Sequence, residues 1–329
     1  MGEFVRPKVV ISRCIEFENV RWNAQIIRSE FVQKLIPHIE HVTVCPEFDI
    51  GLGVPRDPLR VVKIGDKLRL IQPATEKDLT EKMQKFTRNF LDSLGEIDGF
   101  ILKSKSPSSG LRDVKIYPAL KNTASIGKGP GFFGSAVKER YSYLALEDEG
   151  RLRNSRIREH FLRKLFTLAA FRETRNSNNI NQMIKFHTDN ELLLKSYNQK
   201  ELRVLSRIVA RQKTKPLQEL IEEYSKHFYL ALRKTPRCNS YINVLNNAIR
   251  YFSNQLSENE KSFFFSLIKQ YRNRKVPLIA LIHVVKSWIV RFDEDYLKRQ
   301  TFFHPYPEDL LDVDSIIEAC GDRDYWKEE

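Results

Sequence analysis

The chain has 329 residues, of which 41% are hydrophobic and 29% charged, so it is long enough for two domains with ordinary buried cores. The mean hydropathy is −0.44, and no apolar run approaches the ~18–20 residues that span a bilayer, which excludes an integral membrane protein. The net charge of +13 favours a polyanionic partner, with nucleic acid first, although solubility alone is an alternative explanation.

Cysteine usage indicates the compartment. The sequence contains 4 cysteines, which are widely spaced and form no CxxC pair, so they do not build a disulfide scaffold. The first residues lack the apolar region of a secretory signal. We therefore expect a cytoplasmic protein in a reducing compartment.

Strand and helix patterns alternate over the first 150 residues. Short apolar or β-branched runs predict strands at 8–12, 41–44 and 99–104 and a hairpin at 60–73, and helical spacing predicts helices at 29–40, 78–98 and 131–141. This alternation predicts an α/β domain, residues 1–150, with a mostly parallel sheet and flanking helices.

Only helical periodicity remains after residue 150. Helices are predicted at 156–172, 182–198, 200–212, 216–234, 240–256, 258–274 and 277–292. Pro216 and Pro277 stand where two of these helices start. The second domain, residues 151–329, is therefore predicted to be all-α. It carries 32 Lys/Arg and 22 Asp/Glu, a net charge of +10, against 23 and 20, or +3, in residues 1–150.

Two cysteines and one serine follow predicted strands. Cys14, Cys45 and Ser109 all come just after apolar runs, and open α/β sheets bind ligands beyond the carboxyl ends of their strands. Soft thiolates at such an edge suit an iron–sulfur cluster or zinc. An equally weighted alternative is that both cysteines are small buried hydrophobic residues.

Three further features near this edge are candidates for binding or chemistry. Glu47 follows Pro46 and could position a substrate or move a proton, or it could be an ordinary surface glutamate. Residues 103–110, KSKSPSSG, could form an anion-binding turn. In the glycine-rich segment 127–134, Lys128 and Gly129 could hold a phosphate before a helix, although a flexible turn is the favoured alternative.

Basic residues cluster at the start of the helical half. Arginines and a lysine in this segment could contact the phosphates of an RNA, and the alternative is a solvated helix face. The predicted contact residues are Arg151, Arg153, Arg156, Arg158, Arg163 and Lys164.

Several segments resemble a known two-domain arrangement. Residues 9–14, 44–62, 101–117 and 127–134 resemble the thiouracil desulfurase (TudS-like) family, and 186–198, 241–261, 271–282 and 296–311 resemble the helical YbgA-like domain often fused to it. The combination is similar to RudS-type desulfidases, which remove sulfur from 4-thiouridine in tRNA.

The resemblance implies a site and a cofactor. In that family three cysteines bind a [4Fe-4S] cluster, and Cys14 and Cys45 match two of these ligands. Ser109 stands where the family has the third cysteine. Glu47 matches a catalytic glutamate, and Ser104 or Ser106 would face the substrate. The expected substrate is thiolated uracil, above all 4-thiouridine in tRNA. The alternatives are a catalytically silent RNA-binding paralogue and a desulfurase of free thiouracil.

Overall fold

The computed structural model describes residues 4–311, and these form two compact units. One unit runs to Ala169 and includes the segment from Tyr306, and the other is Ala170–Pro305. The long helix α4 (Ser155–Asn176) contributes to both units. The boundary predicted at residue 150 lies where strands end and only helices follow. The two compact units instead divide within α4, between Ala169 and Ala170.

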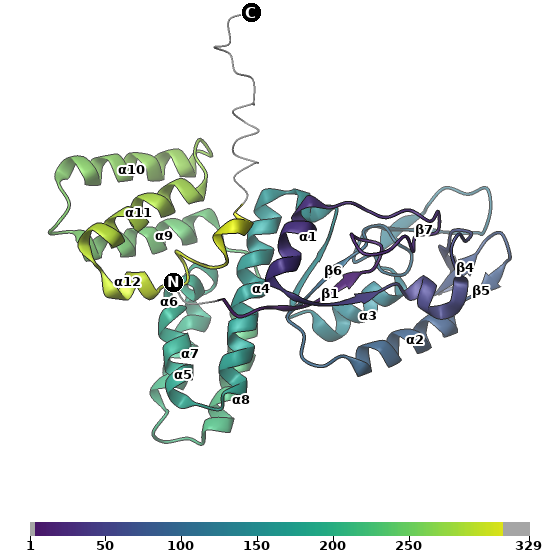
Figure 1. Cartoon of the computed structure of the whole chain (residues 1–329), viewed down its shortest axis with the longest axis horizontal. Coiled ribbons are helices and arrows are strands. Elements are labelled where there is room, and N and C mark those ends of the chain that lie inside the picture. The colour runs from purple at the N-terminus through teal and green to yellow at the C-terminus, as the bar shows by residue number, and fades with distance from the viewer. Residues whose placement is uncertain (1–3, 312–329) are drawn as a thin grey trace, which may run out of the picture. The chain divides into compact units, whose positions relative to one another are not determined.

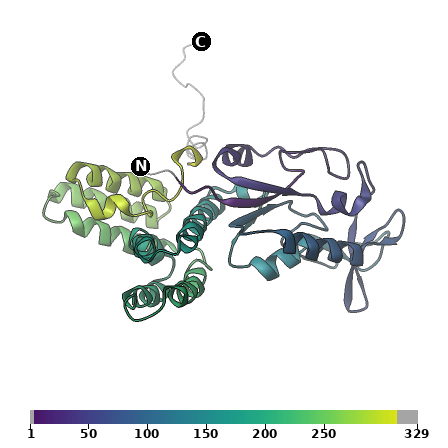
Figure 2. The same ribbon diagram turned by 60° about the horizontal axis from the view of Figure 1, so that its bottom comes forward.

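A four-stranded parallel sheet forms the centre of the first unit, as the alternation predicted. Its order is β2-β1-β6-β9, with bounds Glu40–Val44, Lys8–Ser12, Gly99–Leu102 and Ala145–Asp148. All four residues of β6 are buried, as expected for a parallel strand covered on both faces. Helix α1 (Glu30–Leu35) lies on one face, and α3 (Phe132–Tyr141) lies on the other (Figures 1 and 2).

A second sheet was not anticipated. The predicted hairpin is present, but it belongs to a separate five-stranded sheet of order β5-β4-β3-β7-β8. The bounds are β3 Arg60–Ile64, β4 Lys67–Gln72, β5 Lys77–Asp78, β7 Val114–Tyr117 and β8 Gly127–Gly129. Its own hydrophobic core includes Val61, Leu70 and Val114 together with Met83 of α2 (Thr80–Ser93).

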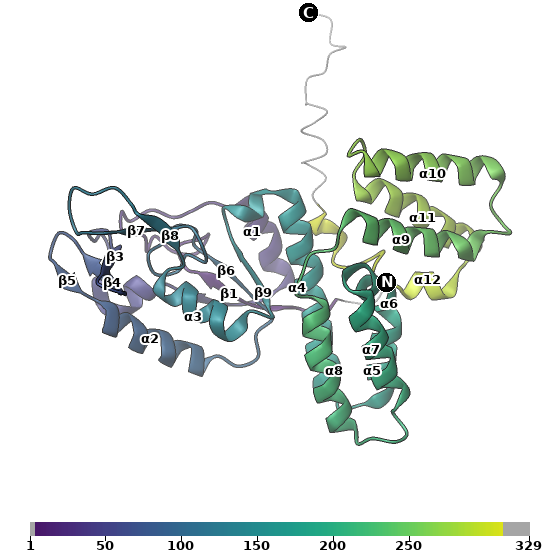
Figure 3. The ribbon, with the colours of Figure 1, turned by 180° about the vertical axis from the view of Figure 1, so that it is seen from behind.

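The second unit is entirely helical in its described residues, as predicted (Figure 3). Its helices are α5 Ile180–Asp189, α6 Glu191–Tyr197, α7 Gln199–Ala210, α8 Leu217–Ala231, α9 Cys238–Ile249, α10 Glu258–Arg272, α11 Leu278–Phe292 and α12 Asp295–Arg299. Pro216 and Pro277 directly precede α8 and α11, which confirms both predicted starts.

One predicted helix is split in two. The segment 182–198 breaks at Asn190, whose backbone leaves the helical region. The Asn190 side chain donates to the carbonyl oxygen of Phe186 at 2.8 Å and accepts from the Thr301 hydroxyl at 2.7 Å. Periodicity could not show this break, because it depends on a contact with a segment more than a hundred residues later.

Candidate active site

The carboxyl ends of the four parallel strands bring the candidate residues to one edge of the sheet. Cys14 follows β1, Cys45 follows β2, residues 103–110 follow β6 and Glu149 follows β9. We call residues 103–110 the serine loop. Cys14, Cys45 and Ser109 are all buried, and Cys45, Lys103, Glu149 and Glu47 lie close enough to Cys14 to affect the pKa of its thiol. The parallel topology therefore assembles the residues that the sequence singled out.

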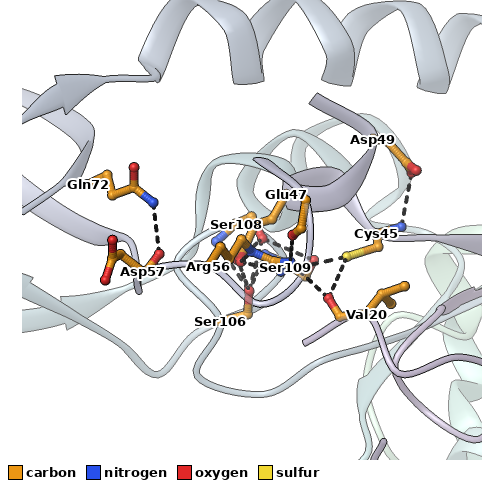
Figure 4. A network of polar contacts seen from close by, with 11 residues as sticks. Val20, Cys45, Glu47, Asp49, Arg56, Asp57, Gln72, Ser106, Ser108 and Ser109 are labelled. Carbon is orange, nitrogen blue, oxygen red and sulfur yellow. Dashed lines mark hydrogen bonds and ion pairs between the residues drawn. The ribbon is translucent and has the colours of Figure 1, made fainter. Parts of the chain in front are cut away.

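Glu47 is the centre of the polar network at this edge (Figure 4). Its Oε1 accepts from the hydroxyls of Ser108 at 2.8 Å and Ser106 at 3.2 Å. Its Oε2 accepts from Arg56 Nη2 at 2.8 Å and Nε at 3.1 Å. Glu47 is therefore a buried carboxylate that holds the serine loop against the segment after β2, and not an ordinary surface glutamate.

Arg56 completes this network, and the sequence reasoning missed it. Its side chain is only 3% exposed, and its Nη1 donates to the carbonyl oxygens of Val20 at 3.0 Å and Gly53 at 2.9 Å. Its Nη2 lies 4.0 Å from the sulfur of Cys45, which itself lies 3.6 Å from the Val20 carbonyl. The sequence offered only an indirect signal for Arg56: a buried carboxylate beside Cys45 needs a cationic partner.

Ser104 and Ser106, which the sequence could not separate, belong to different networks. Ser106 contacts Glu47, whereas the Ser104 hydroxyl donates to Glu149 Oε1 at 2.8 Å and its backbone N–H to Oε2 at 2.7 Å. Lys103 Nζ also donates to Glu149 at 2.6 Å. The start of the serine loop is therefore fixed by Glu149 and its middle by Glu47. Lys103 and Glu149 were not among the predicted site residues.

The end of the glycine-rich segment contacts the serine loop. Lys128 and Gly129 lie in β8, which pairs with β7. The first amides of α3 are already used, because Gly131 N–H donates to Gly110 O at 2.8 Å and Gly134 N–H to Ser108 O at 3.0 Å. The amides of Gly131 and Gly134 at the start of α3 are thus occupied by carbonyl oxygens of the serine loop, whereas Lys128 is exposed, and the anion site at Lys128 and Gly129 stays a prediction.

These glycines allow a close backbone approach. A Cβ on Gly134 would lie 2.3 Å from the carbonyl oxygen of Gly110, and one on Gly131 would lie 2.5 Å from that of Ser108. Neither distance is compatible with a side chain. A flexible turn, the favoured alternative, therefore does not describe Gly131 and Gly134, because close backbone contacts hold the start of α3 against the serine loop.

The donor set at the edge does not supply three thiolates. Cys14 and Cys45 offer sulfur, but Ser109 offers a hydroxyl, which lies 3.5 Å from the hydroxyl of Ser108. Within residues 4–311, no group of three His, Cys, Asp or Glu side chains is placed to hold a metal ion. Cys238 belongs to α9 in the other unit, and Cys320 lies outside the described residues. A serine oxygen is harder than sulfur, so these residues do not fit a cluster held by three cysteines.

Burial sets the protonation of both thiols. The pKa of Cys14 is raised to about 12, chiefly by burial and then by the neighbouring Cys45. Burial also raises the pKa of Cys45, although a backbone hydrogen bond from Phe48 opposes this. Without a bound cation, both cysteines are neutral thiols at neutral pH and weak nucleophiles.

The six predicted RNA contacts differ in exposure. Arg153 and Arg156 are exposed, Arg151 pairs with Glu147 at 2.8 Å, and Arg158 lies over the ring of Phe31. Two other members of the set are buried: Arg163 is paired with Glu159, and Lys164 donates to the carbonyl oxygen of Leu144 at 2.7 Å. Arg163 and Lys164 are therefore corrected to structural residues, because a buried cation cannot reach an RNA phosphate.

Comparisons with known proteins match both halves of the chain. Residues 9–149 match the family described as 2-thiouracil desulfurase, and residues 191–307 match a family of unknown function, DUF1722. An uncharacterized Escherichia coli (strain K12) protein, YbgA, is 24% identical over 126 residues, which are 38% of this chain and 75% of that protein. An uncharacterized Bacillus subtilis (strain 168) protein, YbbK, is 28% identical over 109 residues, 31% of this chain and 72% of that protein.

One solved structure is also similar. It is described as the [4Fe-4S]-dependent thiouracil desulfidase TudS, with 22% sequence identity and a TM-score of 0.35, and the match covers 45% of this chain and 94% of that one. Every helix in residues 4–311 is too short or too polar to cross a lipid bilayer.

Proposed function

We propose that this chain, which combines a 2-thiouracil desulfurase domain with a DUF1722 domain, removes sulfur from thiolated uracil by hydrolysis. Water would replace the sulfur of the C=S group, giving C=O and hydrogen sulfide, so the reaction needs no oxidant or reductant. The observation that carries this proposal is the Glu47 carboxylate, which is buried beside Cys45 and bonded to two serine hydroxyls and Arg56.

The residues at this edge have distinct proposed roles. Glu47 would accept a proton from the attacking water, and Arg56 keeps its carboxylate in place through two nitrogen contacts. Ser106 is the serine assigned to face the substrate, because it contacts Glu47 while Ser104 is engaged by Glu149. Ser104 would act indirectly, because its contacts with Glu149 fix the start of the serine loop.

The finer substrate proposal is 4-thiouridine within tRNA. The exposed side chains of Arg153 and Arg156 and the net charge of +10 in residues 151–329 support contact with a phosphate backbone. A desulfurase of free thiouracil would not need this basic half. The family resemblance also suggests a [4Fe-4S] cluster, but Ser109 places a hydroxyl where that family has its third thiolate.

The second candidate function is a catalytically silent protein that binds thiolated RNA. Ser109 favours it, because a serine at the third ligand position should weaken cluster binding. The two functions differ in turnover and not in substrate recognition.

The experiment measures sulfide release from 4-thiouracil and from tRNA containing 4-thiouridine, using the wild-type chain, Ser109→Cys and Glu47→Gln. Iron and sulfide are quantified after anaerobic reconstitution. Turnover by the wild type that Glu47→Gln abolishes supports the proposed desulfidase. If only Ser109→Cys takes up about four irons and turns over, the silent protein is the correct assignment. If none of the three chains releases sulfide from either substrate, and calorimetry detects no binding of either substrate, both proposals are refuted.

A further inference from the structure

Trp22 is a large aromatic residue left exposed at the candidate site. It lies in the irregular segment between Cys14 and α1, and it is 45% exposed. Its ring makes no aromatic or cation–π contact among residues 4–311. Single exposed apolar residues are common on protein surfaces, so exposure alone says nothing about function.

The backbone around Trp22 is held by the same arginine that holds Glu47. Arg56 N–H donates to the carbonyl oxygen of Trp22 at 2.8 Å, and its Nη1 donates to that of Val20 at 3.0 Å. Val20 O in turn lies 3.6 Å from the sulfur of Cys45. The segment 20–22 is therefore anchored at both ends to the residue that forms the ion pair with the central carboxylate. An exposed indole on a backbone fixed by Arg56 offers a planar ligand an aromatic surface next to the segment that carries the Glu47 network.

Another exposed aromatic side chain lies next to the network but is already engaged. Phe48 follows Glu47 and is 39% exposed, and the Arg13 guanidinium lies over its ring, 5.7 Å from the centroid. Trp22 is the better surface for a nucleobase, because every base has a π-face and stacking on an aromatic side chain is a common way to hold an unpaired base.

We propose that Trp22 is the stacking platform for the pyrimidine ring of the substrate, and thus a binding residue for thiolated uracil. This inference rests on the proposed function and deepens it, because it names how the base is held. Stacking explains recognition of the ring, whereas Glu47 would take the proton from the water that attacks the thiocarbonyl carbon.

The test compares the binding of 4-thiouridine nucleoside to the wild type, Trp22→Ala and Trp22→Phe by isothermal titration calorimetry. Alanine should weaken binding by about 5- to 150-fold, the range for loss of one base-stacking contact. Phenylalanine should restore most of the affinity, which a purely structural role for the indole nitrogen or the loop would not predict.

Tyr143→Ala is the matched control. Tyr143 is 37% exposed but precedes β9, and so lies at the opposite edge of the parallel sheet. This variant should bind as the wild type does. Equal affinity of Trp22→Ala and wild type would overturn the stacking role alone, as would Trp22→Phe binding as weakly as Trp22→Ala while both variants show wild-type circular dichroism. Absence of binding by the wild type would instead refute the proposed function.

Discussion

Arg56 offers the sharpest test of how the site is built, because it serves the fold and the site at once. The substitution Arg56→Met keeps much of the side-chain volume and removes the guanidinium. Glu47, whose side chain is 11% exposed, then loses two nitrogen donors, and the carbonyl oxygens of Val20 and Gly53 lose one each.

The expected loss of stability is large. Removing one partner of a buried ion pair leaves an uncompensated charge and typically costs about 3–5 kcal/mol of unfolding free energy. The matched control is Arg140→Met, which breaks a pair with Asp92 whose side chains are 46% and 66% exposed. An exposed pair contributes about 0–1 kcal/mol, so the control should have almost no effect.

Urea denaturation of the full chain, followed by circular dichroism, measures both variants. The double variant Glu47→Gln with Arg56→Met should recover much of the loss, because it removes the unpaired charge as well. A loss for Arg56→Met no larger than that for Arg140→Met would refute the reasoning, since it would mean that Glu47 finds solvent or another cation.

Other perturbations test separate parts of the structure. Gly134→Ala, whose Cβ would lie 2.3 Å from a serine-loop carbonyl, should weaken 4-thiouridine binding in calorimetry, whereas Gly127→Ala, with nothing within 4 Å, should not. Burial lowers the pKa of Lys164 from 10.5 to about 8, so its protonation opposes folding below pH 8 and this penalty disappears toward pH 10.5. The stability advantage of Lys164→Met over wild type in urea denaturation should accordingly shrink by ~3 kcal/mol across that range. Replacing Arg153 and Arg156 by glutamine should weaken tRNA binding and reduce the salt slope by about one per residue; an unchanged slope would remove them from the interface.

The fold was predictable where periodicity reports on burial. The apolar runs at β1 and β6 and the helical spacing after residue 150 carry their own signal, and both appear as expected. The second sheet was not predictable, because β7 and β8 are short and pair through contacts that no local pattern encodes. Asn190 shows the same limit, since its break in the helix depends on Thr301.

The site was predictable to the extent that topology places residues together. Residues after parallel strands share an edge, so Cys14, Cys45 and Glu47 could be grouped from sequence alone. Arg56 could not, because it follows an irregular turn and reaches its partners through side-chain contacts. The prediction that Lys164 contacts RNA was wrong for the opposite reason. A basic helical pattern predicts a solvent-exposed face, and the sequence does not show which other segments of the same chain bury this side chain.

The position of Ser109 separates the chemistry of the site from its architecture. The serine loop is held by Glu149 at residue 104, by Glu47 at residues 106 and 108, and by α3 through backbone carbonyls. Ser109 contributes its backbone N–H to Ser106 at 3.1 Å, while its hydroxyl makes only a 3.5 Å contact with Ser108. A sulfur atom in place of that oxygen would remove none of the hydrogen bonds that anchor the loop. Wild type and Ser109→Cys should therefore share one fold and nearly one stability, so any difference in iron uptake or turnover between them is attributable to the donor atom itself.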